Sequence, residues 1–90
     1  MRAYTDVFKK PLDKYEVTGI VIEIIRHKQP TTAFITRRGK WGIGKALAIL
    51  NLLEDAGVIS PGMRGRRTIL LKDPDAAINA ALRQLKKGRK

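Results

Sequence analysis

Cysteine is absent from the 90-residue sequence, and histidine occurs only once. Without thiols the chain has no disulfide, no thiolate metal ligand and no cysteine nucleophile. A single imidazole does not build a metal site alone. We therefore expect no metal, no cofactor and no small-molecule substrate, and we predict that the chain is not an enzyme.

Long apolar runs are missing as well. The longest, residues 19–25, is interrupted by Glu23 and is far shorter than the roughly 20 residues that span a bilayer. No secretory signal precedes it. We expect no membrane partner and a cytoplasmic location.

Acidic residues are scarce, with 8 Asp and Glu against 19 Lys and Arg, which gives a net charge of +11. The excess is concentrated in residues 31–72, where eight basic side chains face two acidic ones. Such an imbalance favours a polyanionic partner. A basic surface is therefore expected in the middle of the chain.

Apolar residues recur at spacings of three and four from Leu12 to His27, which predicts a first helix with Asp13 as its N-cap. A strand over Val17–Ile25 is the alternative, because Gly19 and the β-branched residues weaken a helix. The length of the segment favours the helix. Pro30 should end it.

A second helix is expected from Thr31 or Thr32 to Gly39, and a third begins after the turn of residues 40–42. The inward stripe predicted for this third helix is Ile43, Ala46, Leu47, Leu50 and Leu53. Its other face would show Lys45, Ala48, Asn51 and Asp55. Gly57 supplies the left-handed stop.

Two apolar segments, Val58–Ile59 and Arg66–Leu71, flank a turn with Pro61, Gly62 and Gly65, which predicts a β-hairpin. A fourth helix starts at the Asp73-Pro74-Asp75 sequence. The predicted fold is mainly α with a small β-hairpin: a winged helix-turn-helix of three helices plus wing, with an extra C-terminal helix.

This interpretation divides the chain into an N-terminal arm (1–11), a winged-helix domain (12–72) and a C-terminal helix with a basic tail (73–90). Two cationic clusters without an acid would form its DNA-binding surface. Arg37, Arg38, Lys40 and Lys45 lie around the interhelical turn, and Arg64, Arg66 and Arg67 lie at the hairpin tip. The alternative for both clusters is a solvated surface that serves solubility.

Residues 39–45 also read Gly-x-x-x-x-Gly-Lys, the outline of a phosphate-binding P-loop. A P-loop needs Ser or Thr after the lysine, where this chain has Ala46, and a preceding strand. We therefore do not predict nucleotide hydrolysis. Trp41, beside the turn, is expected to anchor the core rather than to stack on a base.

The sequence Arg37-Arg38-Gly39-Lys40-Trp41-Gly42-Ile43-Gly44-Lys45-Ala46, with residues 53–61, resembles the gamma domain of FtsK/SpoIIIE-type DNA translocases. The resemblance covers about residues 15–71 and implies a winged-helix fold that recognises DNA. The family's Tyr-Asn-Arg-Ala motif corresponds to residues 43–46, so Gly44 and Lys45 hold DNA-reading positions. Ala48 stands where the family commonly has another arginine.

We therefore expect a free-standing, nucleoid-associated module that binds double-stranded DNA, with the third helix in the major groove and the basic wing on the adjacent groove. Two alternatives remain open. One is a phage- or plasmid-type transcriptional regulator that self-associates through the C-terminal helix. The other is a protein-interaction module whose third or fourth helix docks on a partner.

Overall fold

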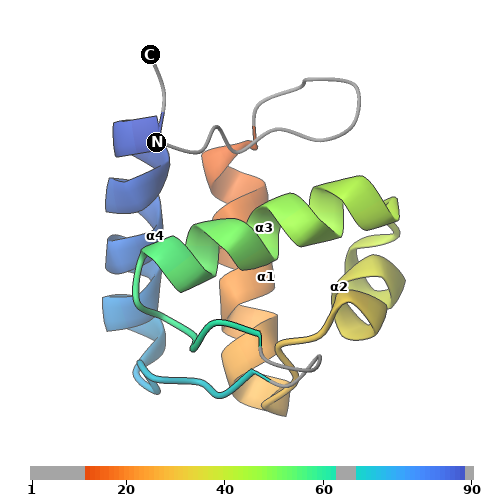
Figure 1. Cartoon of the computed structure of the whole chain (residues 1–90), viewed down its shortest axis with the longest axis horizontal. Coiled ribbons are helices and arrows are strands. Elements are labelled where there is room, and N and C mark those ends of the chain that lie inside the picture. Colours follow the sequence, from red (N-terminus) through yellow and green to blue (C-terminus); the bar gives the residue numbers. More distant parts are fainter. Residues whose placement is uncertain (1–11, 63–66, 89–90) are drawn as a thin grey trace.

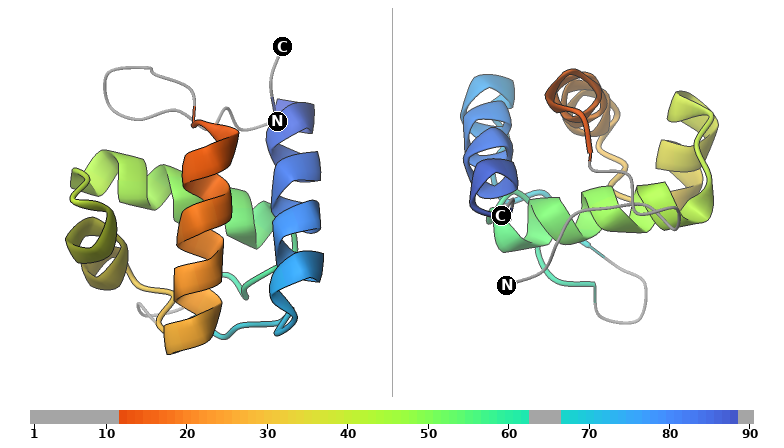
Figure 2. Two further views of the ribbon diagram at one scale, coloured as in Figure 1. Left: turned by 180° about the vertical axis from the view of Figure 1, so that it is seen from behind. Right: turned by 90° about the horizontal axis from the view of Figure 1, so that it is seen from above.

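The computed structural model describes residues 12–62 and 67–88 and contains four helices. They are α1 (Lys14–His27), α2 (Thr32–Gly39), α3 (Ile43–Asp55) and α4 (Pro74–Gly88). Helices α1 and α4 run side by side in opposite directions, and α3 crosses in front of them in the view of Figure 1. Helix α2 packs at the N-terminal end of α3, at the opposite side of the molecule from α4 (Figures 1 and 2).

Side-chain caps begin three of the helices where the sequence predicted them. The Asp13 carboxylate accepts hydrogen bonds from the backbone N–H groups of Tyr15 and Glu16. The Thr31 hydroxyl accepts one from Phe34, and the Asp73 carboxylate accepts one from Ala76. Each cap satisfies a donor that has no partner within its helix. The predicted positions of all four helices are confirmed, including the helix rather than the strand over residues 17–25.

A single apolar core joins the four helices. Helix α4 contributes Ala77, Ala81 and Leu85, and the two alanines let its backbone come close to α1. Trp41 packs partly buried against the same core, as expected. The largest side chains that are fully enclosed are Leu12, Ile24, Ile35, Ile49, Leu50, Leu52, Leu53 and Ile59.

The predicted β-hairpin is wrong. In residues 12–62 and 67–88 the chain forms no strand, and antiparallel pairing is limited to one isolated bridge between Ile59 and Ile69. The reason lies in the loop between α3 and α4. Val58 and Ile59 are both 0% exposed, so two successive side chains enter the core instead of alternating as on a sheet. The described part of the fold is therefore all-helical, and the predicted winged helix is wrong.

The orientation predicted for α3 is also wrong in its first turns. Ile43 and Leu47, expected inside, are 66% and 43% exposed, whereas Ala48, Ile49 and Leu52 are buried. Helix α3 packs on α2 near one end and on α4 near the other, and the loop that follows it adds Val58 and Ile59 to the core. This packing encloses most of its circumference and leaves its N-terminal outer surface in solvent.

Candidate nucleic-acid interface

The connection between α2 and α3 consists of Lys40, Trp41 and Gly42. Lys40 closes α2 in the left-handed conformation (φ 55°, ψ 40°), and its N–H donates to the carbonyl of Thr36. Trp41 then folds back over Gly39, where a Cβ atom would lie 2.7 Å from the indole. A side chain at residue 39 would push the indole away, so the glycine allows Trp41 to pack over the end of α2.

The N-terminus of α3 has no side-chain cap. Its N-cap residue is Gly42, and Ala46 is the first residue whose N–H donates to the Gly42 carbonyl. The N–H groups of Ile43, Gly44 and Lys45 consequently have no acceptor within the helix. Such groups, together with the positive end of the helix dipole, attract anions.

Two of the predicted cations lie at the end of α2 and in the turn that follows it. Arg37, in the last turn of α2, and Lys40, in the turn, are both exposed. In the part of the chain that the structure describes, no carboxylate forms an ion pair with either of them. Their charges therefore remain available to a partner.

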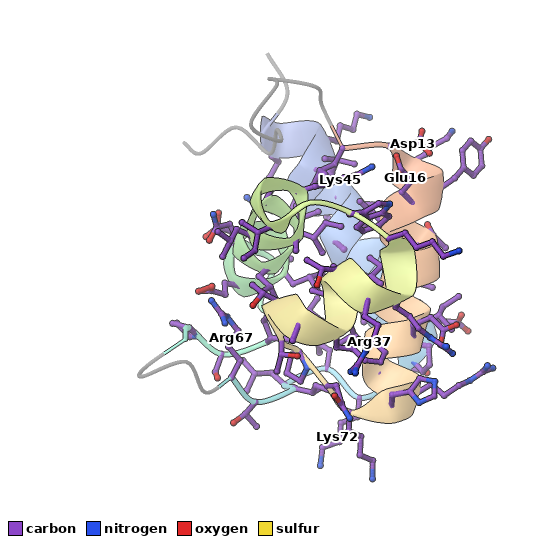
Figure 3. All side chains as sticks on the ribbon, turned by 90° about the vertical axis from the view of Figure 1, so that its right-hand side faces the viewer. Asp13, Glu16, Arg37, Lys45, Arg67 and Lys72 are labelled. Atoms are coloured by element: carbon purple, nitrogen blue, oxygen red, sulfur yellow. The ribbon has the colours of Figure 1, made fainter. Side chains whose placement is uncertain are left out.

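The other two cations of this cluster are bound to α1. Arg38 Nη2 lies 3.4 Å from Glu23 Oε2, and the Lys45 ammonium pairs with the Glu16 carboxylate. The Lys45 ammonium also lies 4.4 Å from the centre of the Trp41 ring, a cation–π contact. Figure 3 shows Lys45 directed toward Glu16. Arg38 and Lys45 thus hold α2 and α3 against α1, and Lys45 is not placed to read bases.

Gly44 and Ala48, the two small residues predicted for the interface, lie in different environments. Gly44 is half-buried in the first turn of α3 and offers only its backbone. Ala48 is 6% exposed and belongs to the core, so it is not a contact residue. The resemblance to the translocase family had implied both positions, but the rotation of α3 places only Gly44 near the surface.

Of the cluster predicted at the hairpin tip, the structure describes only Arg67. Arg64 and Arg66 lie outside the described residues. Arg67 Nε is 3.4 Å from Glu54 Oε1, and the two side chains are only 16% and 13% exposed. This pair offsets an unfavourable charge, because Glu54 lies in the last turn of α3, near the negative end of the helix dipole. Arg67 therefore has a structural partner within the chain.

A second basic area, which sequence reasoning missed, lies between the end of α1 and the loop before α4. Lys28, Arg67 and Lys72 line a pocket of about 370 Å³ with Thr68, above Ile25, Pro30 and Ile69. Figure 3 shows Arg37, Arg67 and Lys72 toward the same end of the molecule, away from Lys45 and Glu16. Lys28 and Lys72 are 44 positions apart in the sequence, and no local pattern links them.

Within residues 12–62 and 67–88, no group of three His, Cys, Asp or Glu side chains could hold a metal ion. The Gly-Lys pair of the P-loop outline lies inside α3 and follows a helix instead of a strand. None of the helices in these ranges is long and apolar enough to cross a membrane.

Comparison of the chain with protein-family models, with curated proteins and with solved structures gave no match. The resemblance to the FtsK/SpoIIIE gamma domain therefore stays a prediction from a short motif. The structure itself offers a helix pair joined by a short turn, in which Arg37 and Lys40 have no ion pair among the described residues and the N-terminus of α3 has no side-chain cap.

Proposed function

We propose that this chain binds double-stranded DNA through the α2–turn–α3 unit, with phosphate groups held by Arg37, Lys40 and the N-terminus of α3. One observation carries the proposal: Arg37 and Lys40 are exposed and form no ion pair within the described residues, and the turn that follows them leads to three N–H groups of α3 that have no acceptor within the helix. Backbone N–H groups, helix N-termini, Arg and Lys are the groups that proteins commonly present to phosphate oxygens.

The acidic side chains nearest this surface support the proposal because they are already engaged. Glu16 and Glu23 of α1 pair with Lys45 and Arg38. Asp13 caps α1. The positive charge of the interhelical turn is therefore not opposed by a free carboxylate from the helix behind it, and a phosphate backbone would be attracted rather than repelled.

The position of α2 adds a second argument. Arg37 and Lys40 lie at its C-terminal end, and Lys28 and Lys72 line the pocket beside its N-terminal end, where Pro30 also lies. In a helix-turn-helix, the helix before the turn crosses the phosphate backbone while the next one enters the major groove. A DNA phosphate backbone that runs along α2 would therefore meet cations at both ends of this helix.

A salt series with matched charge variants tests this function. We compare Arg37→Gln with Arg83→Gln, an exposed arginine of α4 on the opposite side of the molecule from α2. Both variants lower the net charge equally. Affinity for a fluorescein-labelled duplex is measured by fluorescence anisotropy between about 50 and 200 mM salt. Circular dichroism melts confirm that both variants fold.

The expected result is a logarithmic salt slope that is shallower by about 0.9 for Arg37→Gln and nearly unchanged for Arg83→Gln. Identical slopes for the two variants would show that net charge alone drives association and would remove Arg37 from the interface. Absence of duplex binding at low salt would reject DNA binding altogether.

The exposed Ile43 and Leu47 favour a second candidate, a protein-docking surface on α3. Helix α4 is a weaker choice for self-association, because Ile78 and Leu82 pack against the core and Leu85 is buried within it. Sedimentation velocity at micromolar concentration separates the candidates. A stable dimer that Leu47→Lys dissociates would favour docking, and a monomer that binds duplexes would favour DNA.

A further inference from the structure

The outer surface of α3 carries apolar side chains where a DNA-reading helix usually carries polar ones. Ile43 and Leu47 are 66% and 43% exposed, and Asn51, half-buried, follows at the same spacing of four residues. Residues at this spacing lie along one face of a helix. The one cation of α3, Lys45, is turned toward Glu16. This stripe of Ile43, Leu47 and Asn51 therefore presents methyl groups and one amide, without charge.

Resting on the proposed function, we infer that the α3 stripe selects A·T base pairs through the major groove. Thymine is the base with a methyl group in that groove, and apolar side chains contact it favourably. An Asn side chain pairs with the N6 and N7 atoms of adenine. Ile43 and Leu47 would cover thymine methyl groups, and Asn51 would bind an adenine one turn further along.

Discrimination against G·C pairs follows from the same chemistry. Guanine presents two acceptors, O6 and N7, in the major groove, and cytosine presents a donor. Against Ile43 and Leu47 these groups would lose water without gaining a hydrogen bond, which is unfavourable. The charges near the stripe indicate why its partner is DNA: Lys40, in the turn before α3, and the uncapped end of α3 attract an anion at the start of the stripe.

Replacement of thymine by deoxyuridine tests the inference, because it removes only the methyl group from the groove. Binding of the whole chain is compared for an A·T duplex, the same duplex with deoxyuridine, and a G·C duplex of equal length. Burial of one methyl group corresponds to roughly a fourfold change in affinity, so two contacts predict about a 15-fold loss on deoxyuridine substitution.

Three variants test whether residues of α3 cause the difference in affinity between the thymine and deoxyuridine duplexes. Ile43→Ala with Leu47→Ala should bring the thymine-to-deoxyuridine ratio of affinities close to one. Leu70→Ala, which truncates an exposed leucine of the loop (55% exposed), should leave that ratio unchanged. Asn51→Ala should reduce the preference for A·T over G·C while keeping the thymine-to-deoxyuridine ratio.

The outcomes separate the inference from the function on which it rests. If the native chain binds the thymine and deoxyuridine duplexes with equal affinity, the inference is wrong. Because both duplexes are bound in that case, the result would still agree with the proposed DNA binding. Loss of discrimination in Leu70→Ala also overturns it, because the methyl contact would then lie on the loop. Failure to bind any of the three duplexes at low salt overturns the proposed function and the inference together.

Discussion

Replacement of Lys40 by glycine should raise stability and weaken DNA binding at the same time. Lys40 holds the left-handed conformation with φ 55° and ψ 40° at the end of α2. This conformation costs a residue with a Cβ atom roughly 1–2 kcal/mol. Glycine adopts it freely but loses roughly 0.5–1 kcal/mol more backbone entropy on folding than other residues do. The net gain in the free energy of unfolding should be about 0.5–1 kcal/mol.

The same substitution removes an exposed cation beside the N-terminus of α3. If Lys40 neutralises one phosphate, Lys40→Gly should reduce the logarithmic salt slope of duplex binding by about 0.9. The melting temperature of this small domain should rise by roughly 2–8 °C. Stability and affinity therefore change in opposite directions, which damage to the fold would not produce.

Urea unfolding and fluorescence anisotropy measure the two effects, and two controls separate strain from charge. Lys28→Gly relieves the same conformation (φ 55°, ψ 42°) at the end of α1 and should stabilise equally. Lys40→Gln removes the charge but keeps the backbone strain, so it should weaken binding without stabilising. A destabilised Lys40→Gly would refute the strain argument, and an unchanged salt slope would refute the phosphate contact.

Substitutions at Gly42, Lys45 and Arg67 test the remaining assignments. Gly42→Asp and Gly42→Asn should each stabilise α3 by a few tenths of a kcal/mol, because the backbone is extended (φ −69°, ψ 163°) and nothing lies within 4 Å of the new Cβ atom. The aspartate should weaken duplex binding in anisotropy titrations far more than the asparagine, and equal weakening would contradict a phosphate at this helix end. Lys45→Ala should lower the free energy of unfolding by about 1 kcal/mol, through loss of its contacts with Glu16 and the nearby indole, and leave the salt slope unchanged; a shallower slope would return it to the interface. Arg67→Ala should cost roughly 2 kcal/mol in urea unfolding by leaving the Glu54 carboxylate, 13% exposed, without its ion pair, and Glu54→Gln in that background should recover part of the loss.

The helices were predictable because their signals are local. Asp13, Thr31 and Asp73 cap helices through N–H groups two or three residues away. Gly57 has the positive φ of 77° that its place after α3 predicted. The mixed segment over residues 17–25 forms a helix because Asp13 starts it and its apolar side faces the core.

The charges of the candidate interface were predictable as a total but not as individual contacts. The sequence alone shows the net charge of +11 and its concentration in residues 31–72. Whether a given cation is free depends on partners far away in the chain. Arg38 meets Glu23 across 15 positions, and Lys45 meets Glu16 across 29. No spacing rule connects such residues, so Arg37 and Lys40 could not be separated from Arg38 and Lys45 by inspection.

The chain by itself therefore determined where helices start and stop and which sign of charge the surface carries, since both depend on near neighbours or on composition. Tertiary packing alone decided which side of α3 faces solvent. Helix α3 has apolar residues on most sides, so its own sequence does not show which side is buried. Its contacts with α2, α4 and the following loop decide which of these residues are buried. The same packing buries both Val58 and Ile59, so this segment lacks the alternation of a sheet strand, and its antiparallel pairing with the described residues after it is limited to one bridge, at Ile69.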